Sequence, residues 1–218
     1  MNKELVLFDL DYTLLRLNSQ KELASFLFDR KQIGVLFFLK ILFWFILYKL
    51  GVAKNPAAFI KRIYLGLRGV RVDNFAVILT HFFNDRLKSS IYKDAIAEID
   101  FHRSVGRDVV IISTSLQPLV SIVGDYLGLN TTAFGTELEV VAGLYTGAVT
   151  KVLTVEEKIE ICYTLKRGKD LRGTYFYNDH IADLKLLDLV EFPIVVNPNL
   201  AMRKIALARG WEIKYFYK

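Results

Sequence analysis

Short apolar runs alternate with segments of helical periodicity over most of the chain. The runs are rich in β-branched and aromatic residues, and such alternation is typical of an α/β fold with a Rossmann-like, doubly wound parallel sheet. We expect strands at Leu5 to Asp9, Val109 to Ser113, Thr174 to Tyr177 and Pro193 to Val196. We expect helices at Ile91 to Val105, Gln117 to Leu127, Val155 to Lys166, Ile181 to Val190 and Leu200 to Arg209.

The first predicted strand runs directly into acids and a hydroxyl, in the segment Asp9-Leu10-Asp11-Tyr12-Thr13. Side chains two positions apart in a strand share a face, so Asp9 and Asp11 can converge just beyond the sheet. Two carboxylates that close repel each other unless a divalent cation separates them or one keeps its proton, and either outcome suits catalysis. Alone, the segment is equally consistent with a polar turn, because Asp and Thr are common turn residues.

Three later segments carry what a reaction centred on Asp9 needs. A second apolar run ends in the hydroxyls of Ser113 and its neighbours, and Lys158 lies near the start of a predicted helix. A third run ends at Asp179, which stands at helix-type spacing from Asp183. All of these positions fall at the carboxyl ends of predicted strands or in the segments after them, where open α/β sheets bind ligands.

Taken in order, the motifs DxDxT, apolar run then Ser, Lys, and NDxxxD resemble the four signature motifs of the haloacid dehalogenase superfamily. Flanking segments narrow the resemblance to subfamily IB, which includes phosphoserine phosphatase, with a phosphatidylglycerophosphatase C-like member also open. These segments are Phe101 to Gly106, Gln117 to Val120, Gly143 to Gly147 and Val195 to Asn199. The resemblance covers both ends of the chain and is thin only between about Gln20 and Lys88.

The resemblance implies a Mg²⁺-dependent phosphomonoester hydrolase that forms a phospho-aspartate. Asp9 is the implied nucleophile, and Asp11 is the implied acid and base, a residue that relatives acting on carbon–halogen bonds lack. Mg²⁺ is implied to bind Asp9, the main-chain carbonyl of Asp11, and Asp179. The other implied roles are phosphate binding by Ser113, Lys158, Thr13 and Thr114, orientation of the nucleophile loop by Thr13, and support of the metal by Asp183 and Asn178. Phosphotransfer to another acceptor, or a catalytically idle membrane-associated scaffold, stays open.

Two segments depart from the strand–helix alternation. Glu137 to Val149, with its Ala142-Gly143 turn, predicts a β-hairpin near the site. Between about Arg16 and Lys88 the pattern becomes helical. In the subfamily this interval is a cap that closes over the phosphate and chooses the substrate. We therefore expect residues 1–15 and 89–218 to form the catalytic core and residues 16–88 an all-helical cap.

Within the expected cap, the stretch Ile33 to Tyr48 is apolar all round and interrupted only by Lys40. It is shorter than the roughly 20 residues that cross a bilayer, so a full crossing is not expected. A cap helix buried on all sides, a helix lying in a membrane surface, and a dimer contact all stay open. A membrane-surface helix would explain Trp44 near its end and the basic residues around it, which are Arg30, Lys31, Lys49 and Lys54.

Composition agrees with one globular enzyme. The chain has 218 residues, a net charge of +6 and a sequence pI of about 9.3, which favours anionic partners such as phosphorylated metabolites or phospholipid surfaces. Its hydrophobic share of 53% and mean hydropathy of +0.30 indicate some apolar surface that needs a partner. We find no nucleic-acid motif and expect no nucleic-acid partner. We expect Cys162 to pack in the interior and the protein to be cytoplasmic, including the inner face of a membrane as one location. The oligomeric state is open.

The substrate is expected to be a small phosphorylated metabolite or a lipid phosphate such as phosphatidylglycerophosphate. Phosphoserine phosphatases carry a glutamate shortly after the nucleophile loop, where this chain has Arg16-Leu17-Asn18-Ser19. A cationic or neutral segment does not suit the ammonium of phosphoserine, so weak activity on that compound is expected. The candidate specificity residues are Asn18, Arg62 and Arg68, with Arg71 as a further candidate.

Overall fold

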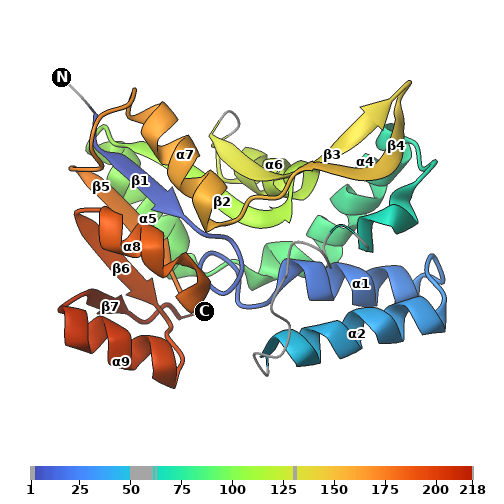
Figure 1. Ribbon diagram of the computed structural model, residues 1–218, viewed down its shortest axis with the longest axis horizontal. Coiled ribbons are helices and arrows are strands. Elements are labelled where there is room, and N and C mark those ends of the chain that lie inside the picture. Colours follow the sequence, from blue (N-terminus) through green and yellow to red (C-terminus); the bar gives the residue numbers. More distant parts are fainter. Residues whose placement is uncertain (1–2, 50–60, 62, 130–131, 218) are drawn as a thin grey trace.

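The computed structural model describes residues 3–49, 61, 63–129 and 132–217, and its elements are shown in Figure 1. A seven-stranded sheet runs through the core in the order β4-β3-β2-β1-β5-β6-β7. Neighbouring strands are parallel except for the antiparallel pair β3–β4. The strands are β1 (Leu5–Phe8), β2 (Asp108–Leu116), β3 (Ala133–Val141), β4 (Leu144–Lys151), β5 (Thr174–Asn178), β6 (Phe192–Val196) and β7 (Glu212–Lys214).

The predicted α/β fold is therefore confirmed, with two differences. The strand β3 starts earlier than the predicted hairpin, and β7 is a strand that the sequence pattern does not predict. β3 begins at Ala133, before the predicted hairpin, and pairs in parallel with β2. The short strand β7 has a charged residue at each end and adds to the edge of β6.

The central strand β1 determines where a ligand can bind. All four of its residues are buried, and their side chains alternate between two apolar clusters on opposite faces of the sheet. β1 pairs with β2 on one side and with β5 on the other. The strands β2 to β4 therefore lie on one side of β1, and the later strands β5 to β7 lie on its other side. A crevice forms at such a switch point beyond the carboxyl end of the strand, which places it next to Asp9.

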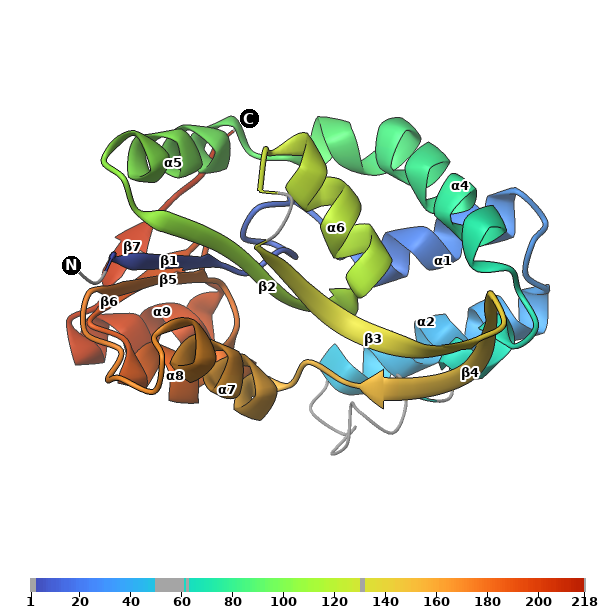
Figure 2. The ribbon, with the colours of Figure 1, turned by 90° about the horizontal axis from the view of Figure 1, so that it is seen from above.

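Helices cover both faces of the sheet. Figure 2 shows α5 (Lys93–Ser104) and α6 (Gln117–Tyr126) on one face. The other face carries α7 (Val155–Leu165), α8 (Leu184–Leu189) and α9 (Leu200–Arg209). These helices confirm the predicted ones to within a few residues at each end. The exception is the segment before α8, which forms the 3₁₀ turn η4 (Ile181–Asp183) instead of the first turn of an α-helix.

The predicted hairpin is confirmed. Ala142 and Gly143 connect β3 to β4 with φ angles of 51° and 75°, both in the left-handed region that a type I′ turn requires. The hairpin reaches beyond the rest of the sheet toward the helical segment, where the Gly69 amide donates to the Tyr145 carbonyl at 2.8 Å. Its far end thus packs on the helices rather than on the core.

The described part of residues 16–88 is helical. It contains α1 (Ser19–Asp29), α2 (Val35–Lys49), the 3₁₀ turn η1 (Leu65–Leu67), α4 (Val72–Phe82) and the π-helical turn η2 (Phe83–Leu87), and the 3₁₀ turn η3 (Lys88–Ser90) follows across its end. The chain leaves and re-enters the core through two paired segments, where the Arg16 amide donates to the Ser90 carbonyl and the Tyr92 amide to the Leu14 carbonyl, both at 3.0 Å. Figure 1 shows these helices together at one end of the molecule, with α1 and α2 below the hairpin and α4 beside it.

Among its described side chains, the apolar helix α2 is buried on one face only, so of the alternatives left open by the sequence, burial on all sides does not hold. Ile41 is buried, whereas five large apolar side chains of α2 are each more than half exposed. The five are Val35, Leu36, Leu39, Phe43 and Ile46. No helix in the described part of the chain has the length and apolar character that a membrane crossing needs.

Candidate active site

Parallel neighbouring strands bring the predicted acids to one edge of the sheet. Asp9 directly follows β1, and its amide continues the ladder by donating to the Tyr177 carbonyl at 3.0 Å. Asp179 directly follows β5, the neighbour of β1. The hydroxyl of the buried Thr13 donates to Asp179 Oδ1 at 3.4 Å, so the loop after β1 closes over the end of β5.

Lys158 is the cation at the centre of this cluster. A capping box of Thr154 and Glu157 begins α7 and fixes the first turn, from which Lys158 enters the core. Its ammonium donates to Asp9 Oδ1 at 3.1 Å and to Asp183 Oδ2 at 2.7 Å, and its side chain is only 2% exposed. The two carboxylates, chiefly Asp183, raise the pKa of Lys158 against the opposing effect of burial, so the ammonium stays charged.

Asn178 and Asp183 form the support around Lys158. The Asn178 side chain donates to Asp183 Oδ2 at 2.9 Å and accepts from the His180 amide at 2.7 Å. The His180 ring in turn accepts from the Ala182 amide at 3.1 Å, which starts η4. Both Asn178 and Asp183 are buried, and their hydrogen bonds hold Asp183 toward the ammonium.

Asp11 lies on the other side of the cluster, against the start of α1. Tyr12, with a φ of 58°, turns the chain after it. Asp11 accepts from the Asn18 side chain and from the Ser19 amide, both at 2.9 Å. Burial raises the pKa of Asp11 to about 7; the hydrogen bonds from Ser19 oppose this rise and the nearby Asp9 adds to it. A carboxyl in this state can hold a proton beside a second acid.

The cluster carries more negative charge than one ammonium balances. Burial raises the pKa of Asp9, with Lys158 opposing, and raises that of Asp179, to which Asp9 and Asp11 add by repulsion. The described residues contain no group of three or more His, Cys, Asp or Glu side chains placed to hold a metal. The metal ligands that the resemblance implies are instead the two carboxylates of Asp9 and Asp179 and the main-chain carbonyl of Asp11. Such hard oxygen ligands, with surplus negative charge, fit Mg²⁺.

The end of β2 supplies hydroxyls to the same edge. Ser113 is buried, and its oxygen accepts from the Ser115 amide at 3.1 Å, which leaves its hydroxyl proton available as a donor. Ser115 shares a hydrogen bond of 2.6 Å with Ser19. The Thr114 carbonyl accepts from the Gln20 side chain at 3.2 Å and from the Thr136 hydroxyl at 2.8 Å. These bonds tie the strand to α1 and to the base of the hairpin.

The structure brings most of the predicted site residues into one cluster, but places the specificity candidates differently. Asn18 caps α1, because its side-chain oxygen accepts from the Lys21 amide, and its side-chain nitrogen donates to Asp11. Arg68 is exposed at the end of η1, Arg71 is an exposed partner of Asp73, and Arg62 lies outside the described residues. Sequence reasoning missed Ser19, Ser115 and Gln20, although a polar run before a predicted helix is an N-cap signal.

Comparison with known proteins identifies the family. The model of the haloacid dehalogenase-like hydrolases matches residues 6–188, and the chain therefore belongs to that family. A protein of Streptomyces azureus called inhibition of morphological differentiation protein is 31% identical over 97% of this chain and 78% of its own length. A probable phosphatase of Mycobacterium tuberculosis is 34% identical over 64% of this chain. A phosphoserine phosphatase of the same organism is 28% identical over 69% of it, and the chain spans about half, 49%, of each of these two.

Solved structures agree. A Bordetella pertussis Tohama I protein of unknown function matches with a TM-score of 0.87 and 25% identity over 98% of both chains. A phosphoserine phosphatase solved as an analogue of its phospho-aspartyl intermediate matches with a TM-score of 0.69 and 20% identity over 100% of this chain and 95% of the other, which supports the fold. Together with the phosphatases among the relatives, the family supports a phosphatase activity for this chain.

Proposed function

We propose that this chain hydrolyses phosphomonoesters through a phospho-aspartate on Asp9, with Mg²⁺ at the edge of the sheet. The observation that carries the proposal is the buried ion pair of Lys158 with Asp9, beside Asp11 and Asp179. An ammonium fixed against a carboxylate at a ligand-binding edge suits a reaction that adds a doubly charged phosphoryl group to that carboxylate.

Each step uses a residue of the cluster. A carboxylate oxygen of Asp9 attacks phosphorus, the ester P–O bond breaks, and Asp11 gives its proton to the departing oxygen. Water then attacks phosphorus, Asp11 takes the proton of that water, and the Asp9–phosphorus bond breaks to release phosphate. Lys158 and the Ser113 hydroxyl donate to the phosphoryl oxygens. Bound Mg²⁺, held by Asp9, Asp179 and the Asp11 carbonyl, would neutralise phosphoryl charge.

A phosphate-release screen tests this proposal. The wild type and Asp9→Asn are compared on a panel of phosphomonoesters, with Mg²⁺ and with EDTA. We expect Mg²⁺-dependent release by the wild type and none above background by Asp9→Asn. The control is Asp170→Asn, an exposed acid paired with Arg172, which is expected to keep full activity. Equal rates for wild type and Asp9→Asn would contradict the proposal.

The same intermediate allows transfer to an alcohol in place of water. An excess of alcohol during the assay separates the two outcomes, since transfer yields a new phosphate ester and hydrolysis yields only inorganic phosphate. We propose hydrolysis. Phosphoserine is expected to be a poor substrate, because the segment from Arg16 to Ser19 offers no carboxylate to its ammonium and already contacts Asp11 and Ser89.

We also propose that the exposed face of α2 rests on an anionic membrane surface, where a lipid phosphate would be available. The specific observation is the row of five exposed apolar side chains on α2, with the exposed Lys31 and Lys40 near it. Flotation with vesicles containing anionic lipid should recover the wild type but not Leu36→Glu combined with Phe43→Glu. Leu207→Glu, at an exposed leucine of α9, is the matched control. Equal recovery of all three proteins, or none of the wild type, would overturn this part of the proposal.

A further inference from the structure

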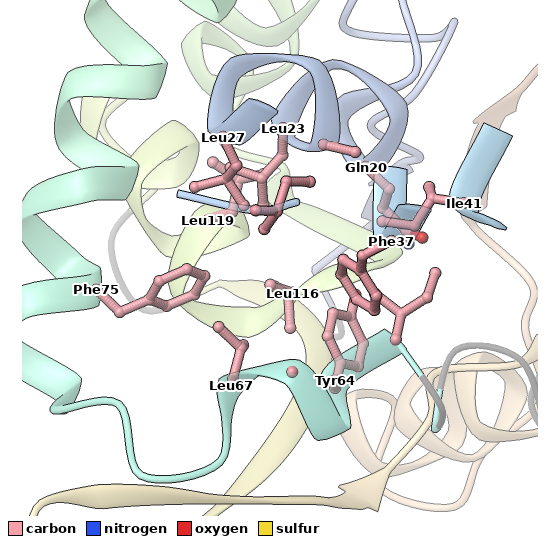
Figure 3. A pocket seen from close by; sticks show the side chains of 14 residues that line it. Gln20, Leu23, Leu27, Phe37, Ile41, Tyr64, Leu67, Phe75, Leu116 and Leu119 are labelled. Atoms are coloured by element: carbon pink, nitrogen blue, oxygen red, sulfur yellow. The ribbon is translucent and has the colours of Figure 1, made fainter. Parts of the chain in front are cut away.

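An apolar cavity of about 80 Å³ lies between the helical segment and the residues where β2 ends and α6 begins, and it has no part in the chemistry described above. Figure 3 shows its lining: Leu23 and Leu27 come from α1, Phe37 and Ile41 from α2, Leu67 and Tyr64 from the η1 region, and Leu116 from the end of β2. Almost every exposed wall atom is apolar, so water gains little by occupying it.

The wall of this cavity adjoins the candidate active site. Gln20 lines the cavity and donates to the Thr114 carbonyl, next to Ser113. Its neighbour Ser19 donates its amide to Asp11. Tyr64 also lines the cavity, and burial together with the charge of Asp11 raises the pKa of its phenol. Gln20 therefore lies in the wall between the cavity and the end of β2 that carries Ser113 and Thr114.

We infer that this cavity binds an apolar part of the leaving group, so that the preferred substrates are phosphate esters of alcohols with an aliphatic substituent near the oxygen. The inference rests on the proposed function, because it assigns the leaving group of that reaction. The volume is about half that of an engineered apolar cavity of about 150 Å³ that takes up benzene, which corresponds to about three carbon atoms. Lipid phosphates and short alkyl phosphates share this chemistry, and an alkyl chain-length series distinguishes them.

Gly66 offers a way to fill the cavity without straining the backbone. It lines the cavity, its φ is not in the left-handed region, and an added Cβ would meet the Phe37 ring at 3.2 Å. A leucine there would project among the lining side chains. Gly34 is the matched control, because a Cβ added at that exposed glycine would meet nothing within 4 Å.

The experiment measures kcat/KM for linear alkyl phosphates from methyl to octyl by phosphate release. For the wild type we expect a rise of about fourfold per methylene over roughly the first three carbons. A plateau after that indicates short esters, and a continued rise to octyl indicates a chain that leaves through the open side, as a lipid would. Gly66→Leu should lower kcat/KM for propyl phosphate by at least about tenfold and leave methyl phosphate unchanged. Gly34→Leu should match the wild type.

A second variant covers the case in which Gly66→Leu does not fold, as judged by its thermal melt. Phe37→Ala enlarges the cavity and should shift the best chain length upward. A flat chain-length series in the wild type, or a series that neither variant changes, would overturn the inference. In both of those cases Asp9-dependent release of phosphate would still stand, so failure of this inference is distinguishable from failure of the proposed function, which shows as turnover that is absent or does not depend on Asp9.

Discussion

Removal of the Lys158 ammonium should separate the catalytic and structural roles of the charge cluster. Lys158→Met deletes two hydrogen bonds, at 3.1 and 2.7 Å, and leaves the buried Asp9 and Asp183 without their cation. Loss of one partner from a buried ion pair typically costs about 3–5 kcal/mol. Because the phosphoryl group also loses a fixed donor, kcat should fall by about 10²–10³.

The loss of stability should depend on pH in a defined direction. In the wild type Lys158 lowers the pKa of Asp9 against the effect of burial, so without the ammonium the folded-state pKa of Asp9 lies still further above its unfolded value. A folded-state pKa that is raised favours the folded protein as pH falls, because the folded form binds the extra proton. The deficit of Lys158→Met relative to the wild type should therefore be larger at pH 8 than at pH 5.

Urea unfolding at both pH values and phosphate release at saturating Mg²⁺ test this prediction. Lys158→Met combined with Asp183→Asn should recover part of the stability and none of the activity, since one uncompensated charge is gone but the donor is still missing. Lys185→Met is the matched control, because that lysine pairs with Glu156 at 2.6 Å on the surface and should cost at most about 1 kcal/mol. A Lys158→Met protein as stable as this control, or one with wild-type kcat, would refute the reasoning.

Three further predictions follow from individual contacts. Asn178→Ala removes two hydrogen bonds of a buried side chain, so urea unfolding should show a loss of about 1–3 kcal/mol, and an unchanged midpoint would contradict this. Burial and Arg107 lower the pKa of His102 to about 4. The neutral ring should therefore contribute less than about 3 kcal/mol to the free energy of unfolding, a contribution present above pH 6.5 and lost as pH falls toward 4. The unfolding free energy of His102→Gln, measured against pH, should lack this slope. Ala142→Asn should raise the unfolding free energy by about 1 kcal/mol in a thermal melt, because asparagine accepts the left-handed turn geometry better than alanine, and a lower melting temperature would refute the assignment of the turn.

The sequence predicts the sheet and its ligand-binding edge because both depend on local signals. β1, β2 and β5 are apolar runs that end in polar residues, and parallel pairing brings Asp9, Ser113 and Asp179 to one edge whatever the loops do. The place of Lys158 in the site could be predicted only with the help of the family resemblance, because nothing in the local sequence shows that a lysine in the first turn of a helix is buried. The ion pair to Asp183 then follows from packing that only the fold supplies.

The helical segment was less predictable for physical reasons. A stretch as uniformly apolar as α2 has no polar stripe to indicate which face is buried, so only the tertiary structure reveals that Ile41 faces inward and Leu36 outward. The charge of Asp11 adds to the raised pKa of Tyr64 across a large gap in sequence, which no local pattern encodes. β7 is too short for a periodic signal, and it forms at the sheet edge beside β6.

Acid-quench trapping of the phosphorylated enzyme tests the central claim most directly. The enzyme is mixed with a good phosphomonoester substrate and Mg²⁺, quenched in acid within the first turnover, digested, and analysed by mass spectrometry. The account predicts a phosphoryl adduct on the peptide that contains Asp9, absent from Asp9→Asn. A phosphoryl group on any other residue, or substrate turnover by Asp9→Asn at the wild-type rate, would contradict it.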